Sequence, residues 1–256
     1  MKKFAIIVAG GSGKRMAAQV PKQFLPLNGK PILMHTLEAF HAYDADLQLV
    51  LVLPEAQLDY WIELCEQHGF TLPHAIAFGG KERYDSVKNG LLMVQQLRGP
   101  QQGSQAEKAL VAVHDAVRPF VDNALLERCY AKAAEVVAVV PVQPLVESLR
   151  RMKPDGGSQA EDRSQFCHVQ TPQVFDADAL WEAYKRPYQD DFTDDASVME
   201  AAGYTISLVD GWRRNIKITT QEDLDLANFW KSCKTQDNFR EAQENFREAQ
   251  EKGQKS

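Results

Sequence analysis

The chain has 256 residues, of which 44% are hydrophobic and 25% are charged, a composition typical of a globular protein that is long enough to bury a substantial core. Its formal net charge of −6 argues against a general affinity for nucleic acid, because non-specific binding to phosphate backbones requires an excess of Lys and Arg. No apolar run approaches the roughly 20 residues needed to span a bilayer, and the first run is too short for a signal peptide. We therefore expect a cytoplasmic protein that binds neither nucleic acid nor membrane.

Apolar runs of strand length recur along the chain and alternate with segments of helical pattern. Most runs are continuous, which is typical of strands buried on both faces of a parallel sheet. The predicted strands span 4–9, 47–53, 74–78, 109–114 and 136–140. The predicted helices span 32–41, 56–68, 86–97 and 124–134. This alternation predicts a three-layer, Rossmann-like α/β fold, in which helices cover both sides of a mostly parallel sheet.

The regular alternation ends between about 143 and 170, where two short strand-like pieces flank a polar Pro-Asp-Gly-Gly-Ser segment. This pattern predicts a protruding β-hairpin arm. A two-stranded hairpin is barely stable alone in water. We therefore expect the arm to pack against a partner subunit and the protein to be a homodimer.

A further helix is predicted after Ile218, with Thr219 or Thr220 as its N-cap. We expect residues 1–235 to form one domain that includes the arm. The remaining tail, 236–256, carries the sequence NFREAQE twice in tandem, at 238–244 and 245–251. Two heptads with one large apolar residue each are too few for a stable coiled coil, so we expect a solvated extension.

The four cysteines and six histidines are scattered along the chain. No C-x-x-C pair occurs, so cysteine spacing suggests neither a zinc site nor a redox motif. His114 directly precedes Asp115 inside an apolar run, a setting in which such a pair is more often structural than metal-binding.

The segment FAIIVAGGSGKRM, residues 4–16, runs from the first predicted strand into three glycines and two cations. It is not the P-loop of NTPases, because it lacks the first glycine of that motif and Arg15 stands where a hydroxyl residue would bind Mg²⁺. It is not the G-x-G-x-x-G dinucleotide fingerprint, because Met16 replaces the last glycine. Backbone N–H groups of such a turn still surround phosphate oxygens, and Lys14, Arg15 and the nearby Lys22 add positive charge. The loop therefore predicts a phosphate site.

The loop AGGSGKRM and the following PKQF resemble the signature of sugar-phosphate nucleotidyltransferases. Further motifs follow in order: GGKERYDSV at 79–87, HDAVRPF at 114–120, QTPQVF at 170–175, TDDASVMEAAGY at 193–204 and NIKIT at 215–219. Together they resemble the 2-C-methyl-D-erythritol 4-phosphate cytidylyltransferase family over roughly residues 3–230. The departures include Val117, which interrupts the usual Asp-Ala-Ala-Arg-Pro, and the arm entry PVQPLVESL, which differs from the shorter entry common in the family.

The resemblance implies transfer of CMP from CTP to the phosphate of methylerythritol 4-phosphate, with release of pyrophosphate. A phosphate monoester has a second pKa near 6 and is mostly dianionic at pH 7, so no general base is needed. The implied catalysis is positioning and electrostatic stabilisation, assisted by Mg²⁺ or another divalent cation. The resemblance assigns catalytic roles to Arg15, Lys22, Arg163 and Lys217. Since Arg163 belongs to the arm, the resemblance also implies that it reaches the neighbouring subunit's site.

The resemblance assigns the remaining site residues as well. The CTP-binding set comprises Ala9, Gly10, Gly11, Ser12, Gly13, Lys14, Gly79, Gly80, Arg83, Ser86 and Ala116. Within it, Gly79, Gly80, Arg83 and Ser86 are expected to select cytosine. The set that binds the sugar phosphate comprises Asp115, Arg118, Thr171 and Thr193. Asp115, at the C-terminal end of a buried strand, also matches the carboxylate that helps to hold Mg²⁺.

Lys217 lies between Ile216 and Ile218 in a strand-like segment. Successive side chains of a strand point to opposite faces, so Lys217 is expected to face a cleft or solvent.

Two alternatives remain open. A cytidylyltransferase for another polyol phosphate, such as ribitol 5-phosphate, would share the nucleotide half of the site and differ at Arg163, Thr171 and Thr193. A non-catalytic nucleotide-binding protein on the same fold would be expected to lack Arg15, Lys22 or Asp115, and all three are present.

Overall fold

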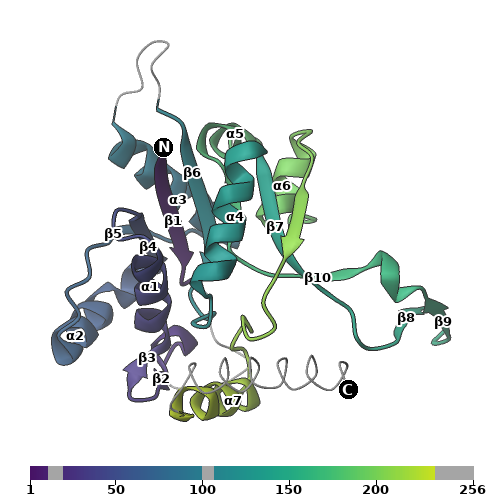
Figure 1. The fold of residues 1–256 in the computed structure, drawn as a ribbon, viewed down its shortest axis with the longest axis horizontal. Coiled ribbons are helices and arrows are strands. Elements are labelled where there is room, and N and C mark those ends of the chain that lie inside the picture. The colour runs from purple at the N-terminus through teal and green to yellow at the C-terminus, as the bar shows by residue number, and fades with distance from the viewer. Residues whose placement is uncertain (11–19, 100–106, 234–256) are drawn as a thin grey trace, which may run out of the picture.

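The computed structural model describes residues 1–10, 20–99 and 107–233. Its core is an eight-stranded sheet in the order β10-β7-β11-β6-β1-β4-β5, with β12 paired to β7 (Figure 1). The strands are β1 (Lys2–Val8), β4 (Gln48–Leu53), β5 (Ala75–Phe78), β6 (Ala109–Asp115), β7 (Ala138–Pro144), β10 (Cys167–Val169), β11 (Gln173–Asp176) and β12 (Ser207–Asp210). β5, β4, β1 and β6 are parallel neighbours, whereas β11 runs antiparallel between β6 and β7. The mostly parallel α/β sheet predicted from the sequence is thus confirmed.

Helices cover both faces of the sheet. One face carries α1 (Ile32–Tyr43), α2 (Leu58–His68) and α4 (Asn123–Glu135), and the other carries α3 (Arg83–Arg98), α5 (Ala177–Ala183) and α6 (Asp195–Ala201). In β1, Ala5 and Ile7 belong to the first core and Phe4 and Ile6 to the second, and all are fully buried. Fully burying a side chain such as Ile or Phe stabilises a fold by about 1.5–3 kcal/mol. A strand that is buried on both faces is therefore apolar throughout, as the sequence pattern predicted.

Helix α7 (Gln221–Ser232) packs with the short strands β2 (Pro26–Leu27) and β3 (Lys30–Pro31) in a third, smaller core. Its N-cap is Thr220, one of the two predicted caps, whose hydroxyl accepts a hydrogen bond from the Asp223 N–H. The preceding residues 215–219 lie within the described part of the chain and form no strand. The interpretation of this segment as strand-like is therefore wrong. Ile218 is instead buried in the third core, and its N–H donates to the Val117 carbonyl (2.9 Å).

The arm projects from the body of the molecule beyond β7 and β10 (Figure 1). Its tip is an antiparallel hairpin of β8 (Leu149–Met152) and β9 (Ser158–Glu161), whose turn contains Gly156 at φ 82°. β10 then returns to pair antiparallel with the end of β7. The hairpin predicted within 143–170 is therefore present, and its base belongs to the main sheet because β7 runs to Pro144.

Three short 3-10 helices complete the described elements: η2 (Lys22–Phe24), η3 (Glu55–Gln57) and η5 (Arg163–Gln165). In the described part of the chain, no helix combines the length and the apolar character needed to cross a membrane. The predicted tail, 236–256, lies outside the described residues.

Candidate active site

The parallel strands β1, β4 and β6 end at one edge of the sheet, which is where open α/β sheets bind ligands. Ala9 and Gly10 follow β1 at this edge. Ala116 follows β6, and its N–H donates to the Val8 carbonyl (3.1 Å), so the two chain segments emerge together. The next residues of the predicted phosphate loop lie outside the described residues: Gly11, Ser12, Gly13, Lys14 and Arg15.

Gln23 links η2 to this edge. It is 1% exposed, and its Nε2 donates both to the Ala9 carbonyl (2.8 Å) and to Gln57 Oε1 (2.7 Å) of η3. An amide nitrogen has two protons, so both are used. Lys22, the first residue of η2, is thereby held close to the start of the phosphate loop.

Ser86 lies next to three glycines of the predicted CTP-binding set. Its Oγ accepts a hydrogen bond from the Gly80 N–H (3.1 Å) and donates to the Glu82 carbonyl (3.1 Å). A Cβ added to Gly79 would lie 3.2 Å from this oxygen, and one added to Gly10 would lie 3.6 Å from it. The structure therefore brings together four residues of the predicted CTP set, Gly10, Gly79, Gly80 and Ser86, beyond the ends of β1 and β5.

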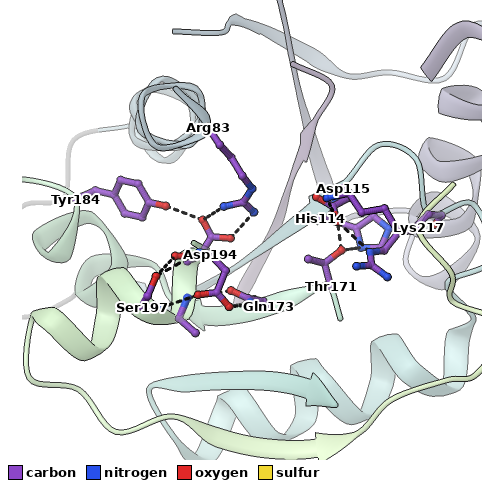
Figure 2. Close-up of polar contacts among 12 residues, drawn as sticks. Arg83, His114, Asp115, Thr171, Gln173, Tyr184, Asp194, Ser197 and Lys217 are labelled. Carbon is purple, nitrogen blue, oxygen red and sulfur yellow. Dashed lines mark hydrogen bonds and ion pairs between the residues drawn. The ribbon is translucent and has the colours of Figure 1, made fainter. Parts of the chain in front are cut away.

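Asp115, the last residue of β6, is the centre of the other half of the site. Its Oδ2 accepts a hydrogen bond from Arg118 Nε (2.9 Å) and lies 3.2 Å from Lys217 Nζ (Figure 2). Burial alone would raise the pKa of this carboxyl, but the charges of Lys217, Arg118 and Arg83 outweigh burial and hold the pKa well below its usual range. Asp115 is thus ionised at neutral pH. One carboxylate paired with two cations leaves a local excess of positive charge, which suits an anionic ligand.

His114 and Thr171 are buried next to Asp115 and are linked to it by hydrogen bonds. The Arg118 carbonyl faces His114 Nε2 (3.1 Å), and a carbonyl only accepts, so Nε2 carries the ring proton. Burial lowers the pKa of His114 to about 4, so the ring is neutral at pH 7 and Nδ1 is an acceptor. The Thr171 hydroxyl, 3.0 Å from Nδ1, therefore donates to it, while its oxygen accepts from the Asp115 N–H (3.1 Å). Thr171 is predicted to bind the sugar phosphate, and the structure commits its hydroxyl proton to His114.

Asn215 ties the segment of Lys217 to the same place. It is fully buried. Its side-chain Nδ2 donates to the Thr171 carbonyl (2.7 Å), and its backbone carbonyl accepts from Arg118 Nη1 (2.9 Å). Lys217, two residues later, keeps a 41% exposed side chain beside Asp115. We refer to the following residues as the Asp115 group: His114, Asp115, Arg118, Thr171, Asn215 and Lys217.

Arg83, predicted to select cytosine, lies in the first turn of α3 and makes a bidentate ion pair. Its two terminal nitrogens donate to the carboxylate oxygens of Asp195 at 3.0 and 2.7 Å, and the Tyr184 hydroxyl donates to the same carboxylate (2.6 Å; Figure 2). Burial acts against the charge of Arg83, but the pairing with Asp195 raises the pKa of Arg83 above its usual value. No sequence pattern singled out Asp195.

Two predicted residues lie away from these contacts. Arg163 lies on η5 in the arm, where it is exposed and donates to the Val146 carbonyl. Thr193 is exposed and immediately precedes Asp194, the N-cap of α6. Within this one chain, Arg163 therefore belongs to the arm rather than to the Asp115 group.

The sequence matches known proteins. The family model for 2-C-methyl-D-erythritol 4-phosphate cytidylyltransferase matches residues 4–232. The chain belongs to this family. A cytidylyltransferase of that name from Bacteroides fragilis is 50% identical over 228 residues, which cover 89% of this chain and 99% of the relative. One from Phocaeicola vulgatus is 49% identical, covering 89% and 98%.

Solved structures of cytidylyltransferases agree with the fold. The Thermus thermophilus 2-C-methyl-D-erythritol 4-phosphate cytidylyltransferase has a TM-score of 0.68 at 30% identity, covering 90% of this chain and 98% of the other. The 4-diphosphocytidyl-2C-methyl-D-erythritol synthase of Anaerococcus prevotii has a TM-score of 0.72 at 26% identity, covering 90% and 96%.

Several polar residues of this cytidylyltransferase family member were given no role by the sequence, although each lies in a quoted motif. They are Gln23 in PKQF, Asp195 in TDDASVMEAAGY and Asn215 in NIKIT. All are at most 1% exposed and hydrogen-bonded. Their partners lie 14, 112 and 44 residues away in the chain. Local sequence patterns carry no record of such distant partners.

Proposed function

We propose that the protein transfers CMP from CTP to 2-C-methyl-D-erythritol 4-phosphate, giving 4-diphosphocytidyl-2-C-methyl-D-erythritol and pyrophosphate. The observation that carries the proposal is the Asp115 group beside the nucleotide edge, in a chain of this family. Its exposed Lys217 and the neighbouring Arg118 provide the positive charge that an incoming phosphate requires.

In the proposed reaction, a phosphate oxygen of the acceptor attacks the α-phosphorus of CTP, and the bond from that phosphorus to pyrophosphate breaks. The acceptor is already mostly dianionic at pH 7, so no side chain needs to remove a proton. The barrier comes from bringing two anions together, and the protein lowers it by positioning and by fixed positive charge. Lys217 and Arg118 act on the acceptor phosphate. Lys22 and Arg15 are proposed to act on the α-phosphate.

We also propose that Asp115 helps to hold Mg²⁺ or another divalent cation. The described residues contain no cluster of three or more His, Cys, Asp or Glu side chains that could enclose a metal. Mg²⁺ at a nucleotide needs no such cluster, because it is commonly held by one or two carboxylates together with phosphates and water. The ionised Asp115 fits this requirement. A bound cation would neutralise part of the charge of the triphosphate.

A homodimer formed through the arm is proposed as the working unit, with Arg163 completing the site of the neighbouring subunit. The support is three large apolar side chains that the arm exposes: Val146 is 63% exposed, Met152 74% and Phe166 42%. Large apolar side chains exposed on a projecting element are available for burial against a second subunit, and a two-stranded hairpin gains stability from such packing. The cytoplasm remains our expected compartment, on the sequence features alone.

The decisive experiment mixes the purified protein with CTP, Mg²⁺ and either methylerythritol 4-phosphate or ribitol 5-phosphate, and follows pyrophosphate release. We expect release with the first acceptor, none with CTP alone, and loss of release when EDTA removes divalent cations. Release with ribitol 5-phosphate only would contradict the proposed acceptor. Binding of CTP without release for either acceptor would favour the non-catalytic alternative. Release that survives EDTA would remove the metal from the proposal.

A further inference from the structure

Asp195, the first residue of α6, is a buried carboxylate that the proposed reaction does not use. It is 0% exposed, and its partners are the guanidinium of Arg83 and the hydroxyl of Tyr184 (Figure 2). Burying a carboxylate costs several kcal/mol unless it is paired and hydrogen-bonded. A fully buried carboxylate with such a complete set of donors holds them in one geometry, because each donor has a fixed direction.

The start of α6, where Asp195 lies, is itself fixed to the sheet. The buried Gln173 of β11 donates from Nε2 to Asp194 Oδ2 (2.7 Å), and its Oε1 accepts from the Ala196 N–H (3.0 Å). Asp194 also forms a capping box with Ser197. The position of Asp195 is therefore set by β11, and the neighbouring Thr193, predicted to bind the acceptor, is carried by the same turn.

The first turn of α3 contacts this region twice. Arg83 binds Asp195, and the hydroxyl of the adjacent Tyr84, which has a single proton to donate, lies 2.6 Å from the Arg186 carbonyl and 3.0 Å from the Tyr184 carbonyl. The same turn carries Ser86, which gathers the glycines of the nucleotide side. Two consecutive residues of α3 therefore join the nucleotide side of the site to the segment that leads to Thr193.

Arg83 also acts electrostatically on Asp115. A third of its side chain (32%) is exposed, and its charge contributes to the low pKa of Asp115. The guanidinium therefore acts on the charge of Asp115 while it is bonded to Asp195 of α6.

We propose that Asp195 is a positioning residue, which holds Arg83 in a bidentate pair and thereby fixes the Thr193 segment against the nucleotide-binding turn of α3. This inference rests on the proposed function for the identity of the two substrates. It assigns Asp195 no contact with either of them. Its effect on the reaction passes through the geometry of Arg83 and Thr193.

The test compares three variants. Asp195→Asn removes the charge that holds Arg83, and Arg83→Lys keeps a positive charge but loses the planar fork that makes two bonds. Tyr184→Phe is the matched control, because it removes a buried hydrogen bond to the same carboxylate and leaves the ion pair in place. Steady-state kcat and KM for both substrates are measured where circular dichroism shows each variant folded, together with Tm.

We expect Asp195→Asn and Arg83→Lys each to lower kcat/KM roughly 10- to 100-fold, since small misplacements in a site built on positioning have effects of this size. The double variant should be no worse than the poorer single one, because both changes break the same pair. Tyr184→Phe should lower Tm and keep near-normal kinetics. Wild-type kinetics in Asp195→Asn would overturn the proposal, and so would a loss in Tyr184→Phe equal to that of Asp195→Asn at similar Tm.

A second readout does not depend on catalysis. Hydrogen exchange of the backbone amides of residues 192–197 should accelerate in Asp195→Asn and Arg83→Lys relative to Tyr184→Phe. Equal exchange in all three variants would overturn the proposal even if the wild-type protein proved inactive with methylerythritol 4-phosphate, an outcome that would count against the proposed function alone. If Asp195→Asn does not fold, Arg83→Lys against Tyr184→Phe decides by the same criteria.

Discussion

The Asp115 group and the arm are built in opposite ways. In the Asp115 group, buried polar groups bond to one another, as when the Thr171 hydroxyl donates to His114 Nδ1 and accepts from the Asp115 N–H. In the arm, polar contacts lie on the surface and large apolar side chains such as Met152 face solvent. The first region is assembled from residues of one chain. The second exposes the kind of surface that another protein surface would cover.

The comparison indicates which parts of the site a single chain builds by itself. The proposed acceptor residues Arg118 and Lys217 converge on Asp115 without help from a partner. Arg163, with an equally cationic side chain, has only its own arm to bind in this chain. Substitutions in the Asp115 group are therefore expected to lower activity strongly in any assembly state. Substitutions in the arm are expected to lower activity only through the contact between subunits.

The largest effect is expected for Lys217→Ala. The change removes the exposed cation beside Asp115 and should lower kcat by about 10²–10³-fold, the usual loss when one preorganised charge or donor is removed from a transition state. Lys153→Ala, at the exposed turn of the arm, is the matched control for loss of one lysine and should keep wild-type kcat. Pyrophosphate release measures both. An unchanged kcat in Lys217→Ala would remove Lys217 from the proposed mechanism.

A smaller and assembly-dependent effect is expected for Arg163→Ala. If the arm completes the neighbouring site, the variant should lose roughly 10- to 100-fold in kcat/KM, as expected for a misplaced or missing positioning contact. Mixing it with Lys22→Ala subunits should restore part of the activity, because a mixed dimer contains one site with both residues intact. Absence of rescue in a purified mixed dimer would count against a shared site and place Arg163 outside it.

The sequence predicted the sheet well and the polar contacts poorly, for physical reasons. Continuous apolar runs such as 47–53 and 109–114 identified central strands because both faces of those strands are buried. Short elements were missed, including β12 and α6, because four to seven residues hold too little periodicity to recognise. Segment 215–219 was misjudged because its alternation comes from packing around Ile218 rather than from a strand ladder.

For the candidate site, order along the chain located the motifs but not the partners of their side chains. The resemblance assigned Arg83 to cytosine, and the structure adds a bidentate partner, Asp195, that is 112 residues away. It assigned Thr171 to the sugar phosphate, and the structure commits its hydroxyl proton to His114. Both roles in substrate binding stay predictions. What decides such contacts is tertiary proximity, which local spacing does not encode.

Thr171→Val is expected to lower the stability of the fold without a large change in assembly. Valine keeps the shape of threonine but leaves the buried Asp115 N–H and His114 Nδ1 without the hydroxyl, and each unsatisfied buried group costs about 1–3 kcal/mol. Thr171→Ser, which keeps the hydroxyl, is the matched control and should lose less stability. Urea unfolding of both variants gives the comparison. Equal destabilisation would show that the methyl group, rather than the hydroxyl network, carries the effect.

The smallest effect is expected in the arm itself, for Arg151→Gln. Arg151 Nε bonds Glu161 Oε1 across the hairpin (2.6 Å), but its side chain is 68% exposed. The Glu161 carboxylate raises the pKa of Arg151, yet solvent and salt screen a pair of this kind, so Tm should not change measurably. Thermal unfolding at low and high salt checks this. A clear fall in Tm that depends on protein concentration would instead mean that the pair is covered in an assembled protein, and would place the Arg151–Glu161 pair inside the proposed subunit interface.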